Sequence, residues 1–446
     1  MSQKRSALAR MIVLSAVTLA WLSVPPVPCF AADSAPYEIG IHLRVRYEDK
    51  QDFNFLEGSQ SYGLTRLRLA GKVRLGEGGS YAFLELQDAR VHGEDDPGVP
   101  AVREEVTPNF FVDELDVHQG YLFWRIGERL GLKVGRQKFN LGDKRLVASL
   151  EWANTARVFD GVRFTIGDPK ARSLDVIASQ PVTVNPDDPN DWARVGNRYF
   201  DSEFYALYFT DKATIDQGSY ELFLFHRRQD ELDDEVWNLG GRLTKKFGPV
   251  TWDLQGSQQF GDYNGLDHQA HAFVLAGSYA FATKGLSQVG VAYIQASGDG
   301  DALDGDHETF DNLYPLNHAN YGYMDFFGLP NLENWEVTLK GRFARNLQWR
   351  LAWHRFSLVE SDQDAWYSAG LAPLYTPIVG PEANEDHAGD EVDFTLSFPI
   401  LPKKITVALG YSRFLAGDYL SVRGRDTDAD FWFVQGLLTW NYRPTR

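Results

Sequence analysis

Hydrophobic and polar residues alternate along several long stretches of the chain. In residues 37–48 the apolar side chains take one parity and the charged ones the other: Ile39, Ile41, Leu43, Val45 and Tyr47 against Glu38, His42, Arg44, Arg46 and Glu48. Residues 64–75, 335–343 and 391–398 repeat the pattern. A period of two residues is that of a β-strand with one apolar and one polar face. The alternation therefore predicts an all-β chain.

The length of the alternating segments indicates which kind of all-β protein this is. Strands of soluble sandwiches average about 5–6 residues, whereas about 9–11 residues cross a bilayer at a tilt. The candidate segments have about 9–15 residues, which predicts a transmembrane antiparallel β-barrel of about 18 strands: 37–48, 61–75, 80–92, 113–125, 130–139, 158–167, 172–180, 200–210, 218–228, 235–247, 250–261, 268–282, 286–297, 333–345, 347–359, 388–399, 404–416 and 429–442.

The connections between these segments alternate between short and long. Tight turns such as 76–79, 126–129 and 248–249 are followed by longer loops such as 140–157 and 298–332. Outer-membrane barrels have short periplasmic turns and long extracellular loops. If the first strand runs outward, every tight turn falls on the periplasmic side. Three segments alternate poorly, where we expect β-bulges: 80–92, 113–125 and 130–139.

The first residues resemble a secretory signal peptide. Three bases precede an apolar stretch over residues 11–22, and cleavage is expected after Ala31. The predicted organisation is thus a signal peptide over 1–31 and a single barrel domain over 32–446. The only cysteine is Cys29, and a lipoprotein cysteine is the alternative, although Pro28 before it fits that signal poorly. If Cys29 leaves with the signal, the mature chain has no disulfide.

Composition and charge fit this interpretation and exclude one class of partner. The chain has 14% aromatic residues, 40 Gly and 3 Met, and its net charge is −17. Removal of the signal takes away three bases and no acid, which leaves −20. A strongly acidic exported chain is not expected to bind nucleic acid. The expected surroundings are the bacterial outer membrane, with its lipid bilayer and lipopolysaccharide.

The polar faces of the strands predict the charge of the lumen. Twelve bases are expected to point inward: Arg44, Arg46, Arg66, Arg68, Lys72, Arg74, Arg163, Arg242, Lys246, Lys340, Arg342 and Arg350. Fewer acids share that face: Glu38, Glu48, Asp253, Glu336, Glu391 and Asp393. Many other acids fall in predicted loops, among them 94–96. A basic lumen in an acidic protein favours an anion-selective channel. The alternative for any one arginine is that it pairs with an acid and stiffens the wall.

The sequence gives weaker evidence for other kinds of site. Seven tryptophans on the apolar parity predict aromatic girdles: Trp237, Trp252, Trp335, Trp349, Trp353, Trp432 and Trp440. The carboxylates Asp299, Asp301, Asp304 and Asp306 are weak candidates for calcium ligands, since Asp-Gly clusters also form turns. No other metal or cofactor is expected. No Gly-x-Ser-x-Gly motif occurs, and lone histidines carry no spacing information. We therefore expect no enzyme.

Two segments resemble the alginate-export family of outer-membrane proteins. The first begins with Val134-Gly135-Arg136-Gln137 and continues through 142–152 to Thr155-Ala156-Arg157 and Phe159-Asp160-Gly161-Val162-Arg163. The second runs from Ala296-Ser297-Gly298-Asp299 through Leu313-Tyr314-Pro315 and His318 to Phe327-Gly328. The resemblance implies an eighteen-stranded barrel that exports an anionic polysaccharide through an arginine-rich constriction. It also adds pore-lining or loop-anchoring candidates: Arg136, Arg145, Arg157 and Arg163. The alternative for Gly142-Asp143 and Glu151-Trp152 is a structural, in-folded loop.

The chain departs from the family at its carboxyl end. Exporters of this type carry a sizeable periplasmic loop there that helps to close the pore, whereas the turn between Pro399 and Lys404 is short. The last strand ends at Tyr442, with four residues after it. The resemblance therefore does not indicate which element closes the pore.

Three functions follow from these observations. The first is an outward conduit for an alginate-like polysaccharide, with periplasmic export proteins as expected partners. The second is an uptake porin for small anions or sugars. The third is a barrel enzyme or adhesin without a pore.

Overall fold

The structure is a computed structural model that describes residues 35–93, 110–182, 202–283, 285–343, 346–377 and 385–444. The predicted signal peptide, Cys29 and the loop acids at 94–96 lie outside these residues. No helix of the described part is long and apolar enough to cross a membrane.

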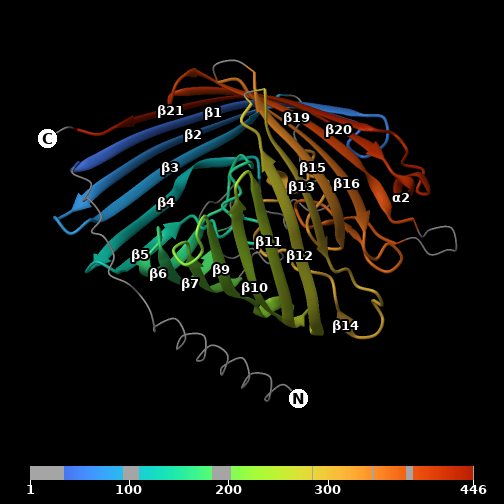
Figure 1. The fold of residues 1–446 in the computed structure, drawn as a ribbon, viewed down its shortest axis with the longest axis horizontal. Helices are drawn as coiled ribbons and strands as arrows, with labels where there is room; N and C mark the ends of the chain where they lie inside the picture. The colour runs from blue at the N-terminus through green and yellow to red at the C-terminus, as the bar shows by residue number, and fades with distance from the viewer. Residues whose placement is uncertain are drawn as a thin grey trace.

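Eighteen long strands form the body of the molecule (Figure 1), as the alternation predicts. Their bounds are β1 (Tyr37–Gln51), β2 (Ser59–Leu75), β3 (Ser80–His92), β4 (Asp113–Ile126), β5 (Leu130–Gln137), β6 (Phe159–Asp168), β7 (Arg172–Pro181), β8 (Glu203–Asp211), β9 (Gly218–Gln229), β10 (Asp234–Phe247), β11 (Val250–Tyr263), β12 (Leu266–Ala280), β13 (Leu286–Ala296), β15 (Leu332–Arg342), β16 (Gln348–Leu358), β19 (His387–Leu401), β20 (Ile405–Ala416) and β21 (Ala429–Tyr442).

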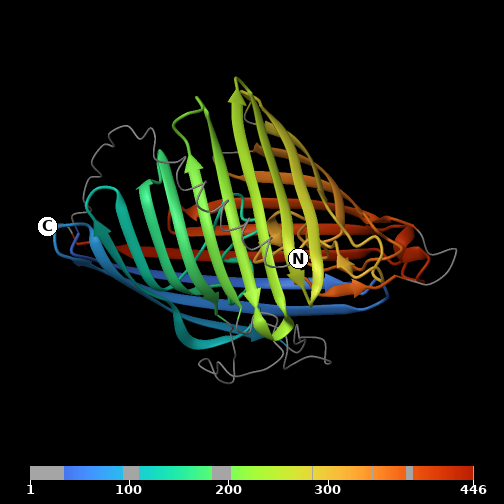
Figure 2. The ribbon, with the colours of Figure 1, turned by 90° about the horizontal axis from the view of Figure 1, so that it is seen from below.

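The sheet closes on itself. Each long strand pairs antiparallel with the next, and β1 pairs with β21 from Ile39↔Tyr442 to Gln51↔Asp430. Figure 2 shows the strands tilted around the closed wall. Closure leaves no free sheet edge, which is the condition for a sheet in hydrocarbon. Two of the three segments expected to carry bulges do so, where β3 pairs with β4 at Glu85/Leu86 and Gln87/Ala89. The third expectation, over 130–139, is wrong, because β5 pairs with β4 and β6 without a register shift.

The two parities of the strands face lipid and lumen as predicted. In β2, Leu67 and Leu69 are 38% and 43% exposed, whereas Arg66 and Arg68 between and beside them are buried. The predicted girdle tryptophans share the outward parity, and four of them are exposed: Trp252, Trp335, Trp432 and Trp440. Trp252 and Trp440 lie near the tight-turn ends of their strands, and Trp335 and Trp432 near the loop ends. Two aromatic belts at the two ends are typical of a membrane barrel.

One end of the barrel carries tight turns and the other carries loops. The predicted short final turn is present, because β19 ends at Leu401 and β20 begins at Ile405. On the loop side, β11 and β12 are joined only by Asn264 and Gly265, whose φ values of 48° and 77° fit a type I′ hairpin. The small elements belong to loops: η1 (Asp230–Leu232), β14 (Asp306–His307), η2 (Asn317–Ala319), β17 (Trp366–Tyr367), β18 (Pro373–Tyr375) and α2 (Asp418–Ser421).

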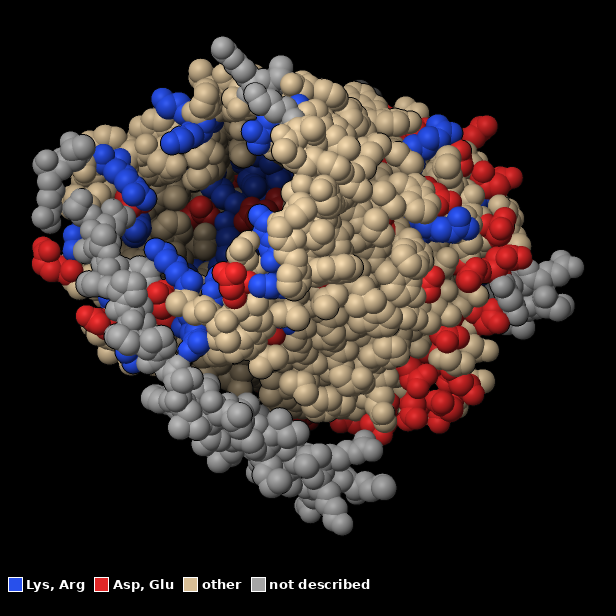
Figure 3. All heavy atoms as spheres, in the orientation of Figure 1, with Lys and Arg blue, Asp and Glu red and all other residues tan. Residues whose placement is uncertain are grey.

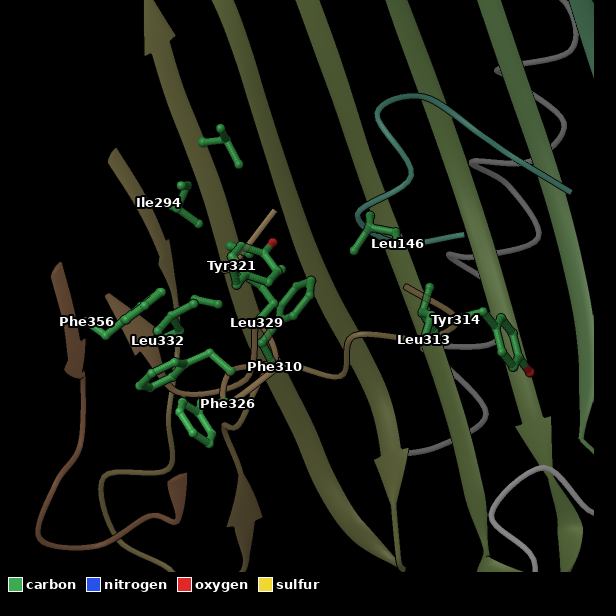
Figure 4. Close-up of a cluster of buried hydrophobic side chains, with 14 of the residues drawn as sticks. Leu146, Ile294, Phe310, Leu313, Tyr314, Tyr321, Phe326, Leu329, Leu332 and Phe356 are labelled. Atoms are coloured by element: carbon green, nitrogen blue, oxygen red, sulfur yellow. The ribbon is translucent and has the colours of Figure 1, made fainter. Parts of the chain in front are cut away.

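Two loops fold into the barrel instead of projecting from it. We call residues 138–158 the first inner loop and residues 297–331 the second inner loop. Their apolar side chains form one buried cluster with strand residues. Figure 4 shows Leu146 of the first inner loop near Leu313 and Tyr314 of the second, and Tyr321 near Ile294 of β13. The predicted strand 130–139 therefore ends early, at Gln137, because Phe139 turns into this cluster and is fully buried. The two loops therefore occupy part of the lumen.

Candidate functional site: the lumen and its inner loops

Four arginines of β1 and β2 point into the lumen from neighbouring positions. Arg44 lies directly opposite Arg66 in the sheet. Arg44, Arg46, Arg66 and Arg68 are all buried, with exposed fractions of 4%, 3%, 8% and 6%. Like charges placed opposite each other repel, so this cluster needs acceptors close by.

The first inner loop supplies those acceptors. Arg44 donates to the carbonyl oxygens of Glu151 at 2.8 Å, Trp152 at 3.1 Å and Ala153 at 3.0 Å. Arg66 donates to the Ala153 carbonyl at 3.1 Å. A guanidinium has five N–H donors in a planar fork, which suits it to binding several carbonyls of one turn. The arginines therefore hold the tip of the loop against the wall.

Glu151 provides the counter-charge at the tip. Its carboxylate lies 2.8 Å from Arg68, 3.2 Å from Arg66 and 2.9 Å from Lys138. Burial alone would raise the pKa of Glu151, but Arg68, Lys138 and Arg66 together hold it well below its ordinary value. Glu151 is therefore ionised at neutral pH and part of the attachment.

Trp152 links the first inner loop to the second. Its ring lies 3.9 Å from the Arg46 guanidinium and stacks on His318 at 3.7 Å, with an interplanar angle of 11°. His318 in turn contacts the Asp325 carboxylate at 3.0 Å. The cation–π contact and the stacking join the wall, the first loop and the second loop in one column.

Arg145 and Arg157 anchor loops to each other. Arg157 donates to the Pro315 carbonyl at 3.1 Å, and Arg145 pairs with Asp143 at 2.7 Å while lying over the Tyr321 ring. Both arginines are buried, with exposed fractions of 8%. These contacts join the first inner loop to the second.

Steric constraints explain why glycine occupies two positions of the first family segment. Gly135 has a φ of +121°, and an added Cβ would lie 2.3 Å from the Gly120 carbonyl oxygen. Gly142 has a φ of +56°, and its Cβ would lie 2.8 Å from the Tyr208 hydroxyl. Only glycine adopts these conformations without strain at such close approach. Gly135 lies just before the chain enters the lumen, and Gly142 within the first inner loop.

Other arginines of the wall pair with carboxylates on adjacent strands. Arg136 binds Asp160 with two hydrogen bonds of 2.9 and 3.0 Å. Arg163 binds Asp175 and Arg242 binds Asp253 in the same forked manner. Three more of the predicted lumen bases lie near carboxylates: Arg350 near Glu336 at 3.0 Å, Lys72 near Glu38 at 3.5 Å and Arg74 near Glu77 at 3.5 Å. For Arg163, Arg242, Arg350, Lys72 and Arg74, wall pairing and a lumen position coexist. Arg136 differs from the prediction of a pore-lining residue, because it shares the outward parity of β5 with Val134, which is 44% exposed.

Bases remain in excess near the tight-turn end. Lys340 and Arg342 are exposed on the lumen parity of β15, and neither forms an ion pair within the described residues. Lys246 at the end of β10 is likewise exposed on the lumen parity and forms no ion pair within the described residues. Figure 3 shows Lys and Arg gathered in a hollow toward the end where the C-terminus lies, with Asp and Glu spread over the opposite side. The separation of charge expected from the sequence is thus visible in the molecule.

The candidate calcium ligands form turns. Asp299, Asp301 and Asp304 each accept a backbone N–H two residues ahead, at 3.1, 3.2 and 2.9 Å. Across the described ranges, no group of three or more metal-ligating side chains that could hold a metal ion is present. Calcium binding, with Asp306 as the fourth candidate, stays a prediction.

Two residues of the site, Asn154 and Gln87, are not marked by any pattern in the sequence. Asn154 donates to the carbonyls of Thr65, Arg90 and Phe111, and Gln87 donates to Asp113 at 2.6 Å. Both are fully buried or nearly so. Neither lies in a pattern that marks it, because their role depends on a loop that returns to strands distant in the sequence.

Comparison with known proteins identifies the family. Residues 35–434 match the family described as alginate export. The chain belongs to the alginate-export family. It is therefore an outer-membrane β-barrel channel of bacteria, as the lumen and the closed wall indicate. Among curated proteins, no relative matches the chain.

Solved structures share the fold at low identity. OccAB1 of Acinetobacter baumannii matches with a TM-score of 0.65 and 14% identity over 91% of this chain and 96% of its own. OccK11 (OpdR) of Pseudomonas aeruginosa matches with 0.57 and 14% over 94% and 100%. OccK2 (OpdF) of the same organism, in complex with glucuronate, matches with 0.59 and 13% over 92% and 98%. At these identities the likeness concerns the fold alone.

Proposed function

We propose that this channel passes an anionic, alginate-like polysaccharide outward through its lumen. The observation that carries the proposal is the excess of bases on the inner wall of a chain whose net charge is −17. Lys246, Lys340 and Arg342 are exposed there without ion pairs in the described structure. Fixed positive charges in a low-dielectric wall lower the barrier for anions and raise it for cations.

The inner loops support a narrow, shaped passage. The first and second inner loops pack on the wall with a shared apolar cluster, and four arginines fix the tip of the first loop. A narrowed channel admits an extended polymer chain residue by residue, and the bases in the remaining space face its carboxylates.

A second candidate is the uptake of small anions. The fold match with OccK2, which was solved with glucuronate, favours it, because that ligand is a monomeric carboxylate. The same basic wall serves either solute. Chain length of the solute, rather than its charge, separates the two functions.

Current blockade in planar bilayers tests the proposal. We expect oligomers of uronic acid, added on the tight-turn side, to interrupt the single-channel current at concentrations where the monomer has no effect. An oligomer makes several simultaneous contacts with the wall, so it stays bound longer than a monomer. Equal blockade by monomer and oligomer would favour small-anion uptake instead, and the absence of any pore current would favour a barrel enzyme or adhesin.

A further inference from the structure

Four aromatic residues lie side by side on the lumen face of β3 and β4. Tyr81 stands opposite Phe123 and Phe83 opposite Tyr121 in the register of the two strands. Phe83 also lies opposite Lys72 of β2, whose side chain belongs to the basic lumen face. The outward parity of the same strands is occupied by residues such as Leu122, which is 49% exposed. The four rings therefore face the channel and not the lipid.

The four rings are in contact with one another, with Tyr81 edge-on to Tyr121 at 68°. The centroids of Phe83 and Tyr121 are 5.1 Å apart with an interplanar angle of 28°, and those of Tyr81 and Phe123 are 5.0 Å apart at 32°. Tyr81 and Tyr121 connect the two pairs at 6.1 Å. We call these four residues the aromatic platform.

The platform differs from the other aromatic residues inside the barrel. Phe204 and Phe225 also face inward, but they are 0% and 2% exposed because the inner loops cover them, with Tyr314 in contact with Phe204. The platform residues are only partly buried and belong to no part of that buried cluster. Packing against the inner loops therefore does not explain four aromatic side chains at this place.

A lysine flanks the platform on each side. The Lys72 ammonium lies 4.6 Å from the centroid of Tyr81, and the Lys133 ammonium lies 4.3 Å from that of Tyr121. Lys133 forms no ion pair within the described structure, so the Tyr121 ring is its partner. A cation–π contact of this kind is weak, and a carboxylate brought close to the ring would bind the ammonium more strongly.

We propose that the aromatic platform is a binding subsite for a carboxylated pyranose ring, one uronate unit of a passing chain. The C–H face of a pyranose ring packs on the negative face of an aromatic ring, and the carboxylate of the same unit binds Lys133. Stacking tolerates sliding along the rings, which suits a transported polymer. This subsite rests on the proposed function, since it takes one unit of the solute proposed there.

The test is the residence time of an alginate hexamer in single-channel recordings. We expect Tyr81→Leu/Tyr121→Leu to shorten the block about tenfold, the effect of losing one ring-stacking contact, with conductance and ion selectivity unchanged. Tyr81→Phe/Tyr121→Phe keeps the rings and should keep the block. Trp124→Leu removes an outward aromatic of β4 that is 62% exposed, so it should leave the block unchanged and controls for strand stability.

The charge part of the subsite has its own comparison. Lys133→Gln should shorten the block by the uronate hexamer but not the block by a neutral oligosaccharide of equal length. An unchanged hexamer residence time in the double Leu variant, or no hexamer block in the wild type, would overturn the proposal that the aromatic platform binds the solute. Equal residence times of neutral and uronate hexamers would overturn the carboxylate contact. Cation selectivity of the wild type is a separate result, because it contradicts the proposed function itself.

Discussion

At the scale of single residues, the lumen arginines of β1 and β2 bind protein backbone. Arg44 has three carbonyl acceptors in the first inner loop, and Arg46 stacks on Trp152. The inward position of these side chains was predictable from the parity of the strand. Their acceptors were not, because the loop that supplies them is about a hundred residues away in the sequence. The alternative reading of Glu151-Trp152 as a structural in-folded loop agrees with these contacts.

Glu151 gives a prediction on pH dependence. Its pKa is held below the ordinary value by Arg68, Lys138 and Arg66 against the effect of burial. The folded pKa is thus the lower one, so the stabilisation is complete above the unfolded value of about 4.3 and is lost as the pH falls through the folded pKa. We expect the conductance to stay constant from neutral pH to about pH 5 and to become noisy only below it.

The variant Glu151→Gln should show at pH 7 the noisy single-channel current that we expect of the wild type in acid. The side chain of Glu151 is 41% exposed, so solvent screens the ion pairs and the loss is on the order of 1 kcal/mol. Single-channel noise across the pH range is the measurement. Identical noise in variant and wild type at neutral pH would show that Glu151 does not hold the loop.

At the scale of elements, the alternation of apolar and polar residues, together with segment length and the rhythm of short and long connections, was enough to place the eighteen long strands, including three that alternate poorly. The reason is physical: lipid on one side and water on the other impose a period of two on every strand. The inner loops carry no such period. Phe310, Leu313 and Tyr314 are buried by folding onto the wall, and an irregular segment does not show in its sequence which surface it will meet. The family resemblance marked these two segments, and an in-folded loop was one of two interpretations for the first of them, but the wall residues that each loop contacts were not predictable.

The column at Trp152 predicts how the two inner loops depend on each other. Trp152→Ala removes both the contact with Arg46 and the stacking on His318. We expect a loss of about 3 kcal/mol in loop attachment, the lower end for a tryptophan truncated in a packed site, and a larger, fluctuating conductance. Limited proteolysis of residues 138–158 in the purified barrel should detect the released loop.

Trp335→Ala is the matched control for that experiment. Trp335 is 46% exposed on the outer face, so its loss should change lipid contact and not the lumen. If the two variants had the same conductance and the same proteolysis pattern, Trp152 would not be the link between the loops.

At the scale of the whole molecule, charge is separated between the lumen and the surface. Bases line the hollow toward the tight turns, and acids are spread over the opposite end (Figure 3). The sequence predicted this separation in sign. The number of bases that remain free was not predictable, because Arg136, Arg163 and Arg242 pair with acids on neighbouring strands. Lys340 and Arg342 therefore have more weight for ion selectivity than the buried arginines.

The reversal potential of the open channel in a KCl gradient tests the central claim most directly. We expect anion selectivity in the wild type and a clear fall in it for Lys340→Gln/Arg342→Gln, because both charges are exposed in the lumen. The control Lys245→Gln/Arg413→Gln removes the same charge from the outward parity of β10 and β20 and should leave the potential unchanged. A cation-selective wild type, or equal shifts in the two double variants, would contradict the account.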